Sequence, residues 1–201
     1  MTRERILTTA ERLVIENGYT ATSVDQVIAE SRTSKGSFFH HFDSKLALAH
    51  ALVQRYVAAD IAQLDRAVEQ VAVSTDPVER VVAFLRLFED GADELMSEQS
   101  SCLYVAVLSE RQLAQTGTSD QIVTAIEAWR STLSRMLTEA LSGPRRTTET
   151  MIDTDALADH LFVTFEGAFL LCRSTGDAAH MRRQLTVMRQ LIESLLTSAA
   201  V

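Results

Sequence analysis

The stretch from residue 23 to residue 45, SVDQVIAESRTSKGSFFHHFDSK, constrains the fold more than any other part of the chain. Ser23 followed three positions later by Gln26 matches a capping box, so a helix is expected to begin here. A short turn is expected at residues 31–33, and Ser34 is suited to cap a second short helix. Two short helices joined by a tight turn form a helix-turn-helix, a motif that places its second helix against DNA.

The second of these helices has one apolar side and one side free of acidic residues. Phe38 and Phe42 are spaced i,i+4 and are predicted to point into the core. Gly36 lies on the opposite side, although glycine costs a helix interior about 1 kcal/mol relative to alanine, which suggests close approach of another molecule. Lys35 and His40 supply cationic or hydrogen-bonding groups on this side. Such a side is suited to phosphates and base edges.

The segment SKGSFFHHFDSK, preceded by ENGYTATSVDQVIAES, resembles the DNA-binding domain of the TetR family of bacterial transcriptional regulators over residues 5–50. The resemblance implies DNA contacts at Ser23, Lys35, Gly36, Ser37, Phe39, His40, His41 and Lys45. Two positions depart from the family pattern. Arg32 replaces the usual glycine of the turn, so that either the turn departs from its left-handed conformation or the arginine adds a phosphate contact. Phe39 replaces the usual tyrosine and lacks its phenolic hydroxyl. Arg3 and Arg5 are further candidates for phosphate contacts, while Lys35, Ser37 and His40 are the candidates for base edges.

The net charge of −8 argues at first against nucleic acid, but the charge is unevenly distributed. Residues 1–48 hold six basic and six acidic side chains, whereas residues 49–201 hold thirteen basic and twenty-one acidic ones. All the excess negative charge therefore lies outside the first 48 residues. The only two lysines of the chain, Lys35 and Lys45, lie in the expected DNA-binding segment.

The rest of the chain is expected to be helical, because apolar residues recur at three and four positions and glycine and proline are sparse. We expect an all-α protein of about nine helices, with a helix-turn-helix domain at 1–48 and a ligand-binding and dimerisation domain at 49–201. A long helix over 45–73 would link the two. The N-terminus lacks the pattern of a signal peptide, and the longest apolar run, 161–172, is short of the ~20 residues of a membrane span. A cytoplasmic protein without membrane contact is expected.

The last two expected helices, 155–174 and 178–199, are apolar over more of their circumference than packing on one side requires. Pairing with the same helices of a second subunit would form a four-helix bundle and cover the remainder. The candidate dimerisation residues are Leu161, Phe165, Leu191 and Leu195. The family resemblance also implies a homodimer.

Aromatic residues of the second domain suggest an apolar cavity with a few polar groups, the usual form of a small-molecule site. Glu166 is informative because a carboxylate in an apolar run needs an arginine such as Arg130 or Arg173, a backbone partner or a ligand. The candidate ligand-binding residues are Phe84, Phe88, Cys102, Tyr104, Trp129, Phe162, Phe165, Glu166 and Phe169. The resemblance implies an inducer pocket here, and the expected effector is an unidentified, largely apolar small molecule.

Other functions are less well supported by the residues. The adjacent pair His40–His41 diverges by 100° around a helix and has no further ligand at metal spacing, so neither a metal nor a cofactor is expected. No phosphate-binding or nucleophile motif indicates an enzyme. Two alternatives stay open: a redox or electrophile sensor that uses Cys102, and a protein-interaction dimer with a degenerate DNA reader. The favoured interpretation is a ligand-responsive repressor that binds a palindromic operator as a homodimer, the repressor role being implied by the resemblance.

Overall fold

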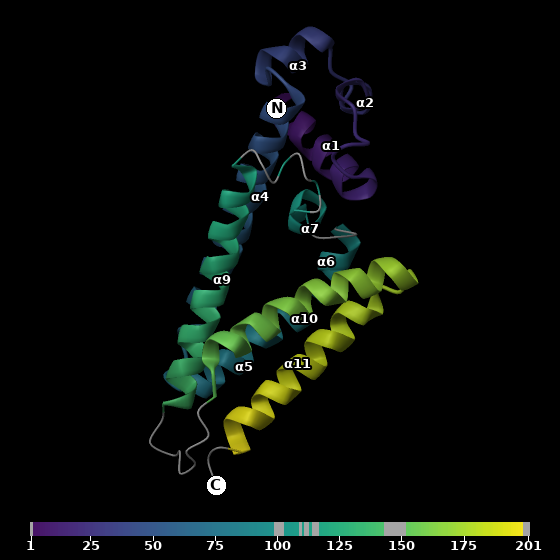
Figure 1. Ribbon diagram of the computed structural model, residues 1–201. Helices are drawn as coiled ribbons and strands as arrows, with labels where there is room; N and C mark the ends of the chain where they lie inside the picture. Colours follow the sequence, from purple (N-terminus) through teal and green to yellow (C-terminus); the bar gives the residue numbers. More distant parts are fainter. Residues whose placement is uncertain are drawn as a thin grey trace. The chain divides into compact units, whose positions relative to one another are not determined.

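The computed structural model describes residues 2–98, 103–108, 110, 113, 117–142 and 152–198 (Figure 1). In these ranges the chain forms ten α-helices and no strand, which confirms the all-α prediction and adds one helix to the expected number. The helices are α1 (Thr2–Asn17), α2 (Val24–Glu30), α3 (Lys35–His41), α4 (Lys45–Val71), α5 (Pro77–Asp90), α6 (Ala92–Glu98), α7 (Leu103–Leu108), α9 (Thr118–Leu141), α10 (Thr154–Thr175) and α11 (Ala179–Ser198).

The chain divides into two compact units that alternate along the sequence. Unit 1 comprises Met1–Asp60 and Ser101–Ala125, and unit 2 comprises Ile61–Ser100 and Ile126–Val201. The long helices α4 and α9 each contribute one end to unit 1 and the other end to unit 2. The expected domain boundary at residue 48 stays a prediction.

Unit 1 is built on the apolar face of α1. Ile6, Leu7 and Leu13 of α1 are at most 2% exposed, and so is Phe38 of α3. Helix α7 also packs on α1 and is itself apolar, with Leu103 and Val107 almost completely buried. The helix-turn-helix therefore shares its core with a segment that follows it by about seventy positions in the sequence.

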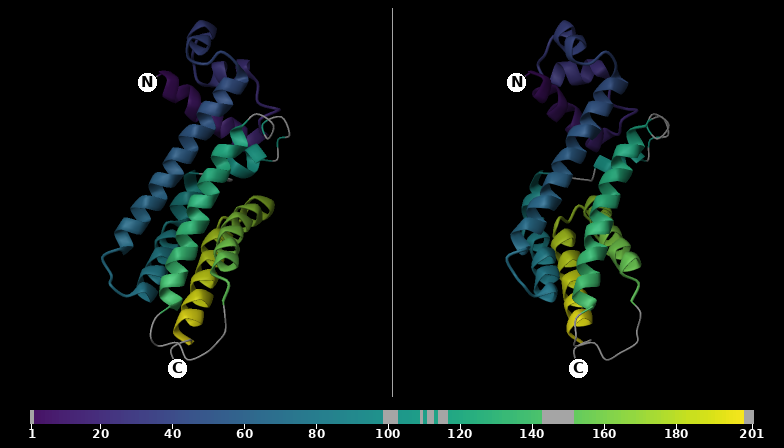
Figure 2. Two further views of the ribbon diagram at one scale, coloured as in Figure 1. Left: turned by 60° about the vertical axis from the view of Figure 1, so that its left-hand side comes forward. Right: turned by 90° about the vertical axis from the view of Figure 1, so that its left-hand side faces the viewer.

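Unit 2 is a helical layer in which α11 packs on both α5 and α10. Figure 1 and the left view of Figure 2 show α10 and α11 side by side, and Gly176 lies in the turn between them. Gly176 adopts a left-handed conformation with φ 73°, which ends α10. A guanidinium–carboxylate pair between Arg189 and Glu89, whose side chains are only 14% and 13% exposed, joins α11 to α5.

Among the described residues, no helix is long and apolar enough to cross a membrane. The apolar runs of α10 and α11 are instead used in packing within unit 2, with Leu161, Met181 and Leu185 among the buried side chains.

Candidate nucleic-acid interface

Both helices of the helix-turn-helix begin at serine caps, as predicted. The hydroxyl of Ser23 accepts from the Gln26 amide at 3.0 Å, and that of Ser34 accepts from the Ser37 amide at 3.1 Å. The expected capping box is not completed: the Gln26 amide oxygen does not accept from the Ser23 amide, and the Gln26 amide nitrogen donates to Glu30 at 3.2 Å. The first helix is thus capped from one direction only.

Helix α3 buries the predicted side and exposes the predicted reading surface. Phe38 and Phe42 are 0% and 3% exposed, and their ring centroids lie 5.7 Å apart. Exposed residues of α3 include Lys35, Gly36, Phe39 and His40, whereas Ser37 and His41 are half-buried. Helix α3 contains no acidic residue.

Two features make this surface accessible to a large ligand. A Cβ added to Gly36 would meet no atom within 4 Å, so open space lies above this position. Phe39 is 43% exposed, and its ring stands edge-on to Phe38 with centroids 5.2 Å apart. Gly36 and Phe39 are three positions apart and thus neighbours on the helix surface. This surface therefore combines an open backbone position with an exposed aromatic ring that packs on Phe38.

The turn between α2 and α3 keeps its left-handed conformation without glycine. Arg32 has φ 50°, and no other non-glycine residue in the described part of the chain has a positive φ. Such a conformation costs a side-chain-bearing residue about 1 kcal/mol or more. The backbone is held by Ser31, whose hydroxyl bonds to Thr33 at 2.9 Å, and by the Arg5 guanidinium, which donates to the Arg32 carbonyl at 3.5 Å.

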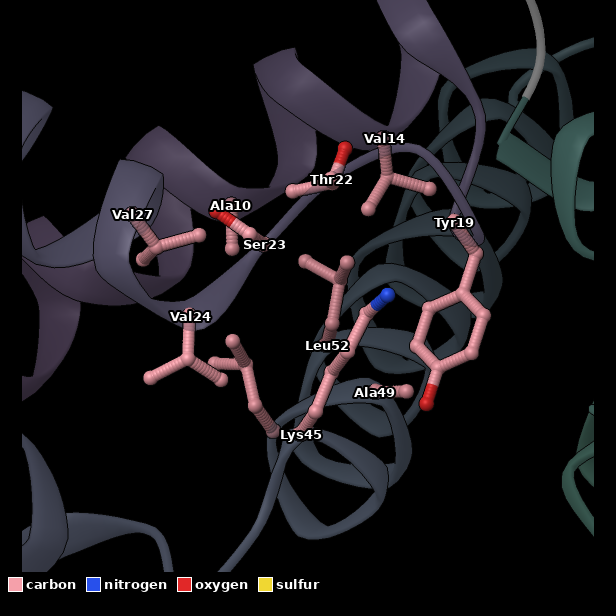
Figure 3. Close-up of a pocket in the computed structure, with 11 residues that line it drawn as sticks. Ala10, Val14, Tyr19, Thr22, Ser23, Val24, Val27, Lys45, Ala49 and Leu52 are labelled. Atoms are coloured by element: carbon pink, nitrogen blue, oxygen red, sulfur yellow. The ribbon is translucent and has the colours of Figure 1, made fainter.

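Lys45, expected on phosphate, has partners within unit 1. Its ammonium nitrogen lies 4.2 Å from the centroid of the Tyr19 ring and donates to the Thr20 carbonyl at 3.3 Å. Burial lowers the pKa of Lys45, while the carboxylate of Glu110 opposes that shift. Figure 3 shows the side chain running beside the Tyr19 ring, across a small hollow whose lining residues are Ala10, Val14, Tyr19, Thr22, Ser23, Val24, Val27, Lys45, Leu48, Ala49 and Leu52.

Glu110, which the sequence did not single out, binds the loop between α1 and α2. Its carboxylate accepts from the hydroxyl of Thr20 at 2.6 Å and from the backbone amide of Thr20 at 3.1 Å. These two bonds, followed by the nearby Lys45 charge, lower the pKa of Glu110. The two residues are ninety positions apart, and no motif connects them.

The candidate ligand-binding residues are only partly brought together. In unit 2, the Trp129 ring stands edge-on to Phe84 and Phe88, with centroids 6.2 Å and 5.4 Å away. Phe165 and Phe169 form a separate edge-on pair at 5.4 Å. Tyr104 belongs to unit 1, where its hydroxyl donates to Asp60 at 2.6 Å.

The remaining polar candidates have varied surroundings. Glu166 and Phe162 are half-buried in α10. Arg130, one of the expected partners of Glu166, forms a two-pronged ion pair with Asp159. Cys102 lies outside the described residues. No group of three metal-binding side chains occurs in the part of the chain that the structure describes.

Helices α10 and α11 both carry exposed apolar side chains, and we call this set of residues the α10–α11 face. Its members are 41% to 67% exposed and comprise Val163, Leu170, Leu171, Val187 and Leu191. Of the expected dimerisation residues, Leu191 belongs to this face, and Phe165 and Leu195 are half-buried. Leu161 is only 3% exposed, so its side chain is already covered within unit 2.

Two family models match the chain over most of its length. The model described as "Bacterial regulatory proteins, tetR family" covers residues 6–52, and the model of a tetracyclin repressor-like C-terminal domain covers residues 77–188. The chain belongs to the TetR family. TetR-family proteins are transcriptional regulators that bind operator DNA through the helix-turn-helix and dimerise.

Individual relatives agree with this membership. The transcriptional regulator AcuR of Cereibacter sphaeroides is 26% identical over 155 residues, which span 77% of this chain and 68% of AcuR. The transcriptional repressor NemR of Escherichia coli is 38% identical, but over 58 residues that span 29% of each protein.

Solved TetR-family structures share the fold of the whole chain. A TetR-family regulator from Agrobacterium tumefaciens superposes with a TM-score of 0.78 at 22% identity, covering 94% of this chain and 96% of the other. The reduced form of E. coli NemR superposes with a TM-score of 0.70 at 21% identity and the same coverage. At these identities the likeness concerns the fold alone.

Proposed function

We propose that this TetR-family regulator is an effector-responsive repressor, and that a homodimer binds a palindromic operator with one α3 helix in each half-site. The observation that carries the proposal is the exposed side of α3, which presents Lys35, Gly36, Phe39 and His40 without a carboxylate. Phe38 and Phe42 hold the opposite side of the helix in the core. A helix presented in this way fits the major groove, where donor and acceptor patterns distinguish all four base pairs.

Selection from a random duplex pool with the full-length chain tests the DNA-binding part of the proposal. The expected result is an inverted repeat whose half-site centres lie about one helical turn, or 34 Å, apart. Mobility-shift titrations with the selected duplex should then give tighter binding than with a scrambled duplex. Failure to enrich any sequence, with binding equal on both duplexes, would argue for a dimer whose reader is degenerate.

Lys35 is the residue proposed to read a base directly, since guanine O6 and N7 are common targets of a basic side chain. Lys35→Ala is expected to cost about 1–3 kcal/mol on the selected operator and little on random duplex. It should also relax the preference at one base pair per half-site. Arg135→Ala, which removes an exposed cation from α9, is the matched control and should change neither the operator affinity nor the affinity for random duplex. Equal weakening on both duplexes would make Lys35 a phosphate anchor.

The α10–α11 face supports the homodimer. Val163 and Leu170 are seven positions apart, and Leu191 follows Val187 by four, so the exposed residues form a stripe along each helix. Large exposed apolar patches mark interaction sites, and a second copy offers the same stripe in a self-complementary arrangement. Analytical ultracentrifugation should show a dimer at micromolar concentration. A monomer under these conditions would contradict the proposed subunit arrangement.

The aromatic cluster of Phe84, Phe88 and Trp129 supports an effector site in unit 2 that favours apolar or aromatic molecules. Trp129 is the only tryptophan of the chain, so its fluorescence reports on this cluster alone. A compound that changes Trp129 fluorescence should also release the operator at the same concentration. Release without any fluorescence change would place the effector site elsewhere.

A cysteine-based sensor is the second candidate, favoured by the likeness to NemR, whose structure is that of a reduced form. Cys172 is buried and lies 3.5 Å from the Ala178 carbonyl oxygen, so we expect it to be inert. Labelling the folded protein with a soft electrophile, followed by peptide mapping, separates the candidates. Rapid modification of Cys102 with loss of operator binding would favour the sensor, and Cys102→Ser would then abolish the response.

A further inference from the structure

Thr20 lies in the loop that joins α1 to the first helix of the reader, and Glu110 follows α7. Both donors of Thr20 bind the Glu110 carboxylate, the hydroxyl at 2.6 Å and the backbone amide at 3.1 Å. A carboxylate that accepts two such bonds is held in a defined place, because charge-assisted hydrogen bonds are shorter and stronger than neutral ones. Both residues belong to unit 1.

The backbone at Gly18, the residue after α1, leaves room for the Glu110 carboxylate. Gly18 ends α1 with φ 87°, and its amide bonds to the Val14 carbonyl at 2.9 Å. A Cβ on Gly18 would lie 3.2 Å from a carboxylate oxygen of Glu110, closer than ordinary van der Waals contact. Glycine is therefore suited to this position both by its conformation and by the approach of Glu110.

The other side of the contact is anchored in the core. Helix α7 packs on α1, and its Leu103 and Val107 are 0% and 1% exposed. The Glu110 amide donates to the Val107 carbonyl at 3.0 Å, so a backbone hydrogen bond links Glu110 to α7. The same Thr20 whose hydroxyl and amide bind Glu110 accepts from the Lys45 ammonium through its carbonyl. One loop residue thus connects α7 to Lys45 and lies three positions before the Ser23 cap.

We propose that Glu110 is a positioning residue for the helix-turn-helix: its carboxylate ties the α1–α2 loop, and with it Ser23 and Lys45, to α7. This inference rests on the proposed function, because it assigns a means by which residues outside the helix-turn-helix set the geometry of the DNA contacts. Loss of the Glu110 carboxylate is therefore expected to release Thr20 and to weaken the operator complex.

Whether operator affinity rises or falls when the Glu110 carboxylate is removed distinguishes a positioning role from simple charge repulsion. Removing a carboxylate near a DNA-binding surface should by itself strengthen binding to any duplex, because phosphate repulsion falls. Glu110→Ala is instead expected to weaken operator binding by about tenfold, a typical coupling between two sites, and to lower the ratio of specific to non-specific affinity. Glu16→Ala is the matched control, since it removes an exposed carboxylate from the end of α1, two positions before Gly18. This control should leave the ratio unchanged.

Two further variants test the contact itself. Thr20→Val removes the hydroxyl donor and keeps the shape of the side chain, so it should reproduce part of the loss and add little to Glu110→Ala. Glu110→Gln retains an acceptor oxygen and should stay within about threefold of the wild type in operator affinity. Equal losses in the Gln and Ala variants would overturn the proposed role of the acceptor.

Hydrogen exchange provides a readout that does not depend on DNA. The Thr20 amide should exchange about tenfold faster in Glu110→Ala than in the wild type, with the core amides of α1 unchanged. Unchanged Thr20 exchange, or a gain in operator affinity like that of a pure charge removal, would overturn the proposal. The two proposals can also fail separately. If Thr20 exchanges faster in Glu110→Ala but the wild-type protein binds no DNA, the proposed function is overturned, whereas the Glu110 contact with Thr20 is supported.

Discussion

The Lys45 ammonium lies against the face of the Tyr19 ring, with 4.2 Å between the nitrogen and the ring centroid. A cation over an aromatic face contributes about 0.5–1 kcal/mol at a partly exposed site. Burial also raises the pKa of the Tyr19 hydroxyl, with the Glu110 charge adding to that shift. Lys45 therefore gives up intramolecular contacts if it turns toward a phosphate.

Lys45→Met tests whether the Lys45 ammonium leaves Tyr19 and contacts a DNA phosphate. The methionine keeps the apolar stem beside Tyr19 and removes the charge, so the fold should persist with a loss of about 1 kcal/mol in the free energy of unfolding. If Lys45 contacts phosphate, specific and non-specific affinity should both fall, and the slope of log affinity against log salt should decrease by about 1 per subunit. An unchanged slope would show that the ammonium stays on Tyr19 in the complex.

Arg32 gives a prediction in which stability and DNA binding change in opposite directions. Arg32→Gly should raise the free energy of unfolding by about 1 kcal/mol, because glycine adopts φ 50° without steric cost. The same change should weaken DNA binding and reduce the salt slope if the guanidinium contacts phosphate.

Arg32→Ala is the control for this prediction. It removes the guanidinium and retains the left-handed strain, so it should weaken DNA binding without the gain in stability. Full DNA binding in both variants would remove Arg32 from the phosphate contacts, and thermal melts would then report only the backbone effect.

Local patterns in the sequence were sufficient to predict the helix-turn-helix and the buried side of α3. The i,i+4 spacing of Phe38 and Phe42 determines which side of α3 is buried, and the serine caps act within three residues of their targets. The exception is Gln26, whose side chain finds Glu30 one turn later on the same helix. Spacing shows which side chains lie within reach of one another, but it does not decide which of their groups form a hydrogen bond.

Long-range relationships were not accessible in the same way. Nothing in the sequence near Glu110 indicates that its partner is Thr20, because the fold alone brings α7 to the α1–α2 loop. Apolar periodicity predicted that α10 has two buried sides, but not which residues lie on each. Leu161 accordingly proves to be covered within unit 2, whereas Val163, two positions later, is 64% exposed.

Leu191→Glu tests the α10–α11 face as the dimer interface. A carboxylate buried without a partner costs several kcal/mol, so the variant should be monomeric in analytical ultracentrifugation and should lose cooperative operator binding. Because Leu191 is 61% exposed in the single chain, the monomer should keep its helical content.

The matched control is Val123→Glu, which places the same charge on a 51% exposed apolar position of α9. The control variant should remain a dimer. If Leu191→Glu also remains a dimer, the interface lies on another face.

Phe39 is predicted to read a thymine methyl group. Its ring is exposed beside the open position of Gly36 and is held edge-on by Phe38, so it presents a rigid apolar surface to the groove. Phenylalanine contacts with the thymine methyl are a recognised form of major-groove readout. Burying one methyl group contributes about 0.8 kcal/mol, which corresponds to about fourfold in affinity.

Substituting deoxyuridine for each thymidine of the selected operator removes the methyl groups one at a time and leaves every hydrogen-bonding group in place. One position per half-site should cost the wild type about fourfold, and Phe39→Ala should be insensitive to that position while still recognising the rest of the site. Phe39→Tyr should keep the sensitivity and bind more tightly, because the added hydroxyl can donate to a phosphate. If no deoxyuridine position separates the wild type from Phe39→Ala, the ring packs within the protein and does not contribute to sequence recognition.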